Sequence, residues 1–86
     1  MNIEFSNEGR EDFLHLEKQH QIFFKRHMEK LLAMPPRRHL QRGIPYHVEN
    51  VTKQARLVYD IQGETLYVNR CFATHEEYER WFKSFK

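Results

Sequence analysis

The first half of the chain carries its large hydrophobic residues at helical spacing. Phe24, Met28 and Leu31 stand at i, i+4 and i+7, so that they fall on one face of a helix. The same half contains few β-branched residues. Between residue 10 and Pro35 it also contains no glycine or proline, the residues that most often signal a turn. Two helical stretches are therefore predicted, at residues 7–18 and 20–33.

Polar residues and prolines predict where these helices begin, bend and end. Residues 3–5 read as a short strand, and Ser6 is placed to cap the helix that follows it. The polar stretch 17–21 predicts a bend between the two helices, with one continuous helix as the alternative. Pro35 and Pro36 end the helical region, because neither can donate a backbone hydrogen bond and each restricts the residue before it.

The second half changes to the pattern of β-strands. Residues 46–51, 55–61 and 64–72 are rich in β-branched and aromatic residues. Gln62 and Gly63 supply the turn between the last two segments, which predicts a tight hairpin with Gly63 at a positive φ. The three segments are therefore expected to form an antiparallel meander.

Alternation within these strands predicts where individual side chains point. In the 55–61 segment one face holds Leu57, Tyr59 and Ile61, and the other holds Arg56, Val58 and Asp60. Arg56 is therefore expected to point away from the layer against which Leu57 packs. The 64–72 segment is partly apolar on both faces, so alternation alone does not orient Arg70.

The chain closes with a predicted amphipathic helix. Thr74 and Glu77 match a capping box, in which each side chain satisfies the backbone N–H of the other residue. One apolar stripe follows at helical spacing, and it consists of Tyr78, Trp81, Phe82 and Phe85. We expect this stripe to be buried, against the sheet or against a partner. The element order predicts a single α+β domain over residues 1–86, with its strands joined in one sheet.

Composition narrows the class of protein further. The 86 residues are 40% hydrophobic and 30% charged, with three Gly and three Pro, which excludes collagen-like, linker-like and disordered chains. No apolar run reaches the roughly 18–20 residues of a membrane span, and the N-terminus lacks a signal-peptide pattern, so a cytoplasmic location is expected. The single cysteine, Cys71, cannot form an internal disulfide or a cysteine-based zinc site, and is expected to be a small buried residue. No cofactor is expected.

Positive charge is concentrated in the middle of the chain. The net charge is +2, yet the segment 37–56 holds five Lys and Arg against one acidic residue. Its cations are Arg37, Arg38, Arg42, Lys53 and Arg56. This distribution predicts a local anion site suited to nucleic-acid phosphate, with a solvated basic loop as the alternative.

Three stretches of the sequence resemble the RelE/ParE superfamily of small bacterial toxins. They are the opening IEFSNEGREDFLHL, the lead-in LLAMPPRRHLQRG, and the stretch ARLVYDIQGETLYVNRCFATHEEY, whose RLVY is the most specific piece. The resemblance covers nearly the whole chain and implies a RelE-like fold. It also implies a cognate antitoxin partner, through which the toxin–antitoxin complex binds operator DNA.

The superfamily contains two activities. The RelE-like branch cleaves messenger RNA, commonly on the ribosome, while the ParE-like branch inhibits DNA gyrase and is not a nuclease. Fold alone does not choose between them. The residues present favour a metal-independent endoribonuclease that acts by 2′-OH attack, with gyrase inhibition or a non-catalytic antitoxin-binding role as alternatives.

The resemblance also implies roles for residues of the second half. Arg56, the arginine of RLVY, matches the family's phosphate-binding arginine, with pairing to Asp60 or Glu49 as the alternative. Arg70 matches a second basic position. His75 resembles the histidine of YoeB-type toxins that is assigned to proton transfer. Tyr78 matches the C-terminal tyrosine that stacks on a base or orients the phosphate, with a core role as the alternative.

Two residues depart from the RelE pattern. Where RelE has lysines, this chain has His47 and Glu49, which share one face if 46–51 is a strand. We expect them near the phosphate site, with Glu49 as general base, His47 as the alternative base, and His75 as general acid. The alternatives are an exposed strand position for Glu49 and a solvent-exposed role for His75. The nuclease interpretation with this base and acid requires Arg56 to point away from the apolar interior, and Glu49 and His75 to lie on the same side of the molecule. Arg37, Arg38, Arg42 and Lys53 would bind the RNA backbone.

Overall fold

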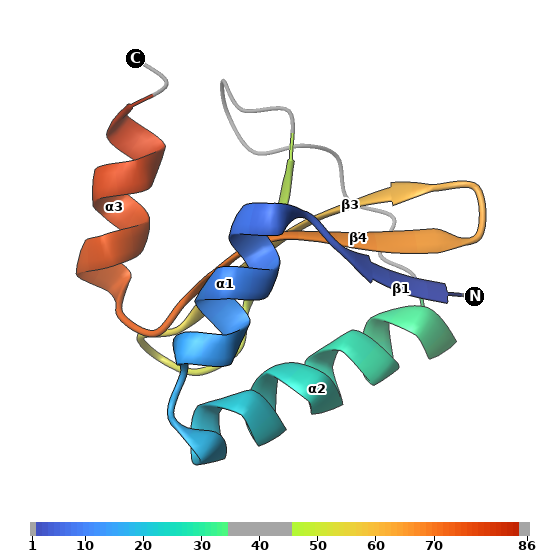
Figure 1. The fold of residues 1–86 in the computed structure, drawn as a ribbon, viewed down its shortest axis with the longest axis horizontal. Coiled ribbons are helices and arrows are strands. Elements are labelled where there is room, and N and C mark those ends of the chain that lie inside the picture. The colour runs from blue at the N-terminus through green and yellow to red at the C-terminus, as the bar shows by residue number, and fades with distance from the viewer. Residues whose placement is uncertain (1, 35–45, 85–86) are drawn as a thin grey trace.

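The computed structural model describes residues 2–34 and 46–84, and these residues form three helices and four strands (Figure 1). Their order is β1 (Asn2–Phe5), α1 (Asn7–His15), α2 (Lys18–Ala33), β2 (His47–Asn50), β3 (Arg56–Gln62), β4 (Thr65–Phe72) and α3 (His75–Lys83). This order confirms the predicted α+β fold. None of the described helices is long and apolar enough to span a membrane.

The described strands form one mixed sheet in the order β1-β4-β3-β2. β2, β3 and β4 make the predicted antiparallel meander, and β1 pairs with β4 in parallel. Gly63 lies in the β3–β4 turn with a φ of 59°, as expected for a hairpin that needs the left-handed region. The sheet therefore joins the N-terminal strand to the C-terminal half of the chain.

The helix boundaries follow the capping signals of the sequence. The Ser6 hydroxyl accepts a hydrogen bond from the backbone N–H of Gly9 at 2.9 Å, which confirms Ser6 as the cap of α1. α1 ends at His15 because Leu16 adopts an extended backbone, and α2 begins at Lys18. The predicted bend is therefore confirmed, slightly earlier in the chain than expected, and the alternative of one continuous helix is wrong.

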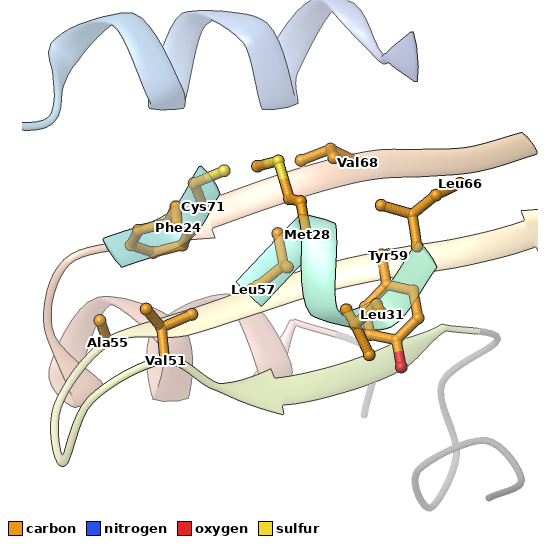
Figure 2. Close-up of a cluster of buried hydrophobic side chains, with 10 residues drawn as sticks. All are labelled: Phe24, Met28, Leu31, Val51, Ala55, Leu57, Tyr59, Leu66, Val68 and Cys71. Carbon is orange, nitrogen blue, oxygen red and sulfur yellow. The ribbon is translucent and has the colours of Figure 1, made fainter. Parts of the chain in front are cut away.

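The hydrophobic core lies between α2 and one face of the sheet (Figure 2). Phe24, Met28 and Leu31 are the buried residues of α2, which confirms the stripe predicted from their spacing. They pack in one cluster with side chains of the sheet and its β2–β3 turn, namely Val51, Ala55, Leu57, Tyr59, Leu66, Val68 and Cys71. Cys71 is a free, buried thiol, as predicted.

α1 packs directly on the backbone of β4, where the pairing with β1 has ended. The backbone N–H of Ser6 donates to the Val68 carbonyl at 2.9 Å, and the Ser6 hydroxyl donates to the Asn69 carbonyl at 3.0 Å. A Cβ atom on Gly9 would lie 2.3 Å from the Val68 carbonyl oxygen. This close approach of helix to strand therefore requires glycine at position 9.

A β-bulge in β4 decides which way the end of this strand faces. Tyr59 pairs with Val68, but the preceding residue of β3, Val58, pairs with Arg70, so that Asn69 is the extra residue. The bulge reverses the alternation after Val68. As a result, Cys71 enters the core and Arg70 lies on the opposite face, together with Val58.

α3 packs on this second face through the end of β4. Thr74 and Glu77 form the predicted capping box. The ring centroid of Phe72 lies 6.2 Å from that of Tyr78 and 5.6 Å from that of Trp81. None of the described α3 residues is fully buried, and Figure 1 shows the helix standing at one end of the molecule. The stripe therefore meets the sheet at the C-terminal end of β4, and Phe85 lies outside the described residues.

Candidate functional site

Arg56 lies on the α3 face of the sheet, as its alternation with Leu57 predicted. It stands opposite Phe72 in the β3–β4 ladder, while Leu57 is completely buried on the other face. The Nη1 atom of Arg56 donates to the backbone carbonyls of Thr52, Lys53 and Ala55 at 3.2, 3.2 and 3.0 Å. The guanidinium is therefore anchored to the β2–β3 turn through one nitrogen, and this contact replaces the predicted alternative of pairing with Asp60 or Glu49.

Arg70 lies on the same face and is anchored by a carboxylate. Its Nε and Nη2 atoms donate to Asp12 of α1 at 2.6 and 3.3 Å. The guanidinium carbon stands 4.9 Å from the centroid of the Phe72 ring, within the range of a cation–π contact. The hydrogen bond to Asp12 is the main cause that raises the pKa of Arg70, so this side chain carries its positive charge at every physiological pH.

α3 places the phenol of Tyr78 against Phe72 and the imidazole of His75 beside that phenol. The rings of His75 and Tyr78 lie 5.9 Å apart, and His75 Nε2 is 3.8 Å from a carboxylate oxygen of Glu79. Burial raises the pKa of Tyr78, with a further contribution from Glu79, and the positive charge of Arg56 opposes this shift. Tyr78 lies against Phe72, which pairs with Arg56 across the β3–β4 ladder, so Tyr78 and Arg56 are on the same side of the sheet. We call Arg56, Arg70, Phe72, His75 and Tyr78 the α3-face cluster.

A shallow cleft of about 240 Å³ adjoins the α3-face cluster. It is lined by Ser6, Glu8, Tyr46, Asn69, Arg70 and Trp81. The rings of Tyr46 and Trp81 have their centroids 6.0 Å apart. Aromatic rings beside the Arg70 guanidinium suit a ligand with planar bases and anionic phosphates, because the rings stack on bases and the guanidinium binds phosphate.

His47 and Glu49 do not lie near Arg56, and the expectation that they do is wrong. Glu49 pairs with Leu57 across the β2–β3 ladder and His47 pairs with Tyr59, so both point to the core face with α2. The two residues do share a face, as predicted, but it is the opposite one. Glu49 and His75 are therefore on different sides of the sheet, and they cannot act together as base and acid on one phosphate.

Glu49 has a different partner, which sequence reasoning missed. Its carboxylate lies 3.1 Å from Nδ1 of His27 in α2, and both side chains are about one quarter exposed. His47 stacks on Tyr59, with ring centroids 5.2 Å apart. The partner residue, His27, lies within α2. Its position three residues after Phe24 and four before Leu31 places it at the margin of the buried stripe, and that spacing was the available signal.

The remaining predicted site residues are placed as follows. Lys53 lies exposed in the β2–β3 turn, next to the carbonyls that hold Arg56. Arg37, Arg38 and Arg42 lie outside the described residues, so their predicted contact with RNA stays a prediction. Burial raises the pKa of the Cys71 thiol far above its ordinary value, which makes this side chain a poor nucleophile. In the described part of the chain, no group of three His, Cys, Asp or Glu residues is arranged to hold a metal ion.

Comparison with solved structures identifies the fold. The chain is similar to the isolated E. coli RelE toxin, with a TM-score of 0.71 and 18% identity over 98% of this chain and 97% of that one. It is similar to a chain of the intact E. coli RelBE toxin-antitoxin complex, with a TM-score of 0.70 and 19% identity over 81% of this chain and 92% of that one. YafQ from E. coli strain BL21(DE3) gives a TM-score of 0.65 and 22% identity over 88% and 94% of the two chains.

The class defined by this architecture is therefore that of small α+β domains with one mixed sheet. Within that class, the chain has the RelE fold, which the resemblance in its sequence predicted. No family model matches the sequence, and no curated protein is significantly similar to it. The likeness at these identities establishes the fold, and the activity has to be argued from the α3-face cluster.

Proposed function

We propose that this protein is the toxin of a toxin–antitoxin pair and an endoribonuclease that cleaves messenger RNA on the ribosome without a metal ion. The RelE fold supports the first part of the proposal. The observation that carries the second part is the α3-face cluster, in which Phe72 pairs with Arg56 and contacts Arg70 and Tyr78, and the His75 imidazole lies beside Tyr78. The cluster offers cations for the charge on the phosphate and a proton donor for the leaving group.

The cluster supports a reaction in which the 2′-oxygen of RNA attacks the adjacent phosphorus. The 2′-O–P bond forms while the P–O5′ bond breaks, which leaves a 2′,3′-cyclic phosphate and a 5′-hydroxyl. Arg56 and Arg70 would stabilise the negative charge on the non-bridging oxygens. Protonated His75 would donate its proton to the 5′-oxygen, and the 2′-hydroxyl would lose its proton to water. Tyr78 would stack on a base or orient the phosphate.

An antitoxin is the second proposed partner, and the toxin–antitoxin complex would bind operator DNA through it. One similar chain comes from an intact toxin-antitoxin complex, and the stripe of α3 offers a half-buried aromatic surface. An amphipathic helix or an extended segment of the antitoxin could pack on this surface and cover the α3-face cluster. Binding of the antitoxin would then block access of RNA, and the free toxin would act in the cytoplasm.

The test is cleavage of messenger RNA on translating ribosomes by the purified protein. We expect Arg56→Ala to lower the cleavage rate by roughly 10²–10³-fold, because a donor to the transition-state charge is lost. His75→Ala should lower it by roughly 10²–10⁴-fold through loss of the proton donor. The matched control is Arg80→Ala, which removes an exposed arginine of α3 that contacts Glu76, and it should cleave at the rate of the unmodified protein. Unmodified protein that never cuts messenger RNA would end the proposal.

Inhibition of DNA gyrase is the second candidate function, and one observation favours it. The presence of His47 and Glu49 argued for nuclease chemistry, but both lie on the face opposite Arg56. Among the described residues, this leaves His75 as the histidine of the α3-face cluster. Inhibition of gyrase supercoiling by the purified chain, without cleavage of messenger RNA, would establish this function. Absence of growth arrest on expression would instead indicate a non-catalytic protein that only binds an antitoxin.

A further inference from the structure

Asp12 contacts the α3-face cluster from α1, an element that otherwise packs on β4. One of its carboxylate oxygens, Oδ2, accepts from Arg70 Nε at 2.6 Å and from the backbone N–H of Cys71 at 3.1 Å. The other oxygen, Oδ1, accepts from Arg70 Nη2 at 3.3 Å. The side chain of Asp12 is about one fifth exposed and that of Arg70 about one quarter. The carboxylate is thus held by the backbone of β4 at the same time as it holds the guanidinium.

The contact uses one edge of the guanidinium and leaves the other open. Arginine has five N–H donors in a planar fork, and Asp12 engages the Nε–H and one N–H of Nη2. The two N–H groups of Nη1 and the second one of Nη2 are therefore directed away from Asp12. That open edge has the spacing that binds two oxygens of one phosphate. The Phe72 ring beneath the guanidinium further restricts its orientation.

We propose that Asp12 is a positioning residue, which holds Arg70 by its Nε–Nη2 edge so that the opposite edge faces the phosphate of the RNA substrate. The proposal rests on the proposed function, because it takes RNA as the ligand of the α3-face cluster. Its physical basis is pre-organisation. A long arginine side chain loses conformational freedom when it binds phosphate, and Asp12 and Phe72 have already removed much of that freedom in the free protein.

The carboxylate has opposite effects on binding and on reaction, which makes the proposal testable. Asp12 cancels part of the positive charge of Arg70. Replacing the carboxylate with a neutral group should therefore leave RNA binding unchanged or make it stronger. The same replacement releases the guanidinium, so it should slow the chemical step. A residue that only stabilised the fold would change neither quantity in folded protein. A fall in kcat with an unchanged or lower KM is therefore the expected signature.

The experiment compares Asp12→Asn, Arg70→Ala and the double variant in cleavage of messenger RNA on translating ribosomes, at a temperature where each is folded by circular dichroism. We expect Asp12→Asn to lower kcat by roughly tenfold or more. In the double variant, Asp12→Asn should add nothing to the effect of Arg70→Ala, because Asp12 acts through Arg70. The control is Glu11→Gln, the same charge change at a neighbouring exposed residue of α1, which should retain the kcat of the unmodified protein. Normal kcat in Asp12→Asn, or a further loss in the double variant, would overturn the proposal.

A second measurement separates failure of this inference from failure of the proposed function. In the NMR spectrum, the Arg70 Nε–H should exchange slowly with water in the unmodified protein and in Glu11→Gln, and rapidly in Asp12→Asn. Addition of a short RNA should shift the Arg70 side-chain signals. If the protein never cleaves RNA yet shows both effects, the nuclease proposal fails and the positioning of Arg70 toward RNA stands. Rapid exchange in the unmodified protein, or no shift with RNA, would contradict the inference itself.

Discussion

Arg56 and Arg70 are each anchored on one side of the guanidinium and open on the other. Nη1 of Arg56 donates to three backbone carbonyls of the β2–β3 turn, and Nε and Nη2 of Arg70 donate to the Asp12 carboxylate. Arginine suits this arrangement because its planar fork can bind two partners at once, whereas a lysine ammonium has no second edge. The same residue type therefore stabilises a turn or strand end and, in the proposed function, also binds an anion.

Tyr59 should make the stability of the protein fall at alkaline pH. Its side chain is 2% exposed, and burial together with the nearby charge of Glu49 raises its pKa from 10 to about 12. Between these two pH values the unfolded chain loses the phenolic proton while the folded protein retains it, so deprotonation favours the unfolded state. The free energy of unfolding should therefore fall between pH 10 and pH 12, by a few kcal/mol at about 1.4 kcal/mol per pKa unit.

The measurement is urea unfolding at several pH values for the unmodified protein and for Tyr59→Phe. Phenylalanine has no proton to lose, so the variant should show a shallower fall over this range. Comparing the two proteins at each pH cancels the titration of the other tyrosines and of the lysines. Parallel curves for the two proteins would contradict the expected contribution of Tyr59.

α1 takes the place of a neighbouring strand along the last part of β4. β1 pairs with β4 only as far as Val68, and beyond that point Ser6 and Asp12 supply hydrogen bonds to the backbone of β4. The unpaired N–H and C=O groups of a strand edge can pair with another chain and promote aggregation. The contacts from Ser6 and Asp12 satisfy such groups on β4. The bulge at Asn69 lies in the same stretch. The packing of α1 and the orientation of Arg70 are thus parts of one arrangement.

Gly9→Ala should test how closely α1 must approach β4. The added Cβ would lie 2.3 Å from the Val68 carbonyl oxygen, a backbone atom that cannot rotate away. α1 would have to move, and we expect the free energy of unfolding to fall by roughly 1–3 kcal/mol or more, although alanine has the higher helix propensity. Chemical denaturation gives the value. Glu11→Ala, at an exposed position of the same helix, is the control and should change stability little.

Two sets of polar residues lie on opposite faces of the sheet. The core face carries His27, His47 and Glu49 at the margin of the hydrophobic cluster, and the α3 face carries the two arginines with His75 and Tyr78. On the core face the polar contacts connect α2 to the edge strand β2. On the α3 face they surround an open surface. The polar residues that stabilise the fold and those of the proposed reaction therefore lie on opposite faces of the sheet.

This separation predicts different outcomes for Glu49 and His75. Glu49→Ala and His27→Ala should each lower the free energy of unfolding by about 1 kcal/mol, since each removes one side of the same half-buried contact. The double variant should be little worse than either single variant. All three should cleave messenger RNA at the normal rate while folded. A large loss of cleavage in Glu49→Ala without loss of stability would show that Glu49 acts on the substrate after all.

The local pattern of the sequence was sufficient to predict the helices and strands and the orientation of Arg56. Capping residues, helical spacing and the Gln62–Gly63 turn act within a few residues of one another, so they can be read without the fold. Arg56 could be oriented because its neighbour Leu57 is strongly apolar in a strand that alternates cleanly. The capping box of Thr74 and Glu77 fixed where the last helix begins, while the resemblance to the toxin superfamily assigned His75 and Tyr78 to the site.

The placement of Glu49, Arg70 and Asp12 required the tertiary structure. Alternation states that His47 and Glu49 share a face, but the pairing of Glu49 with Leu57 decides which face it is. The orientation of Arg70 depends on a bulge, which adds one residue to a strand without a distinctive local pattern. Asp12 and Arg70 are 58 positions apart. Contacts of this kind arise from strand register and packing between distant segments, and no local period in the sequence encodes them.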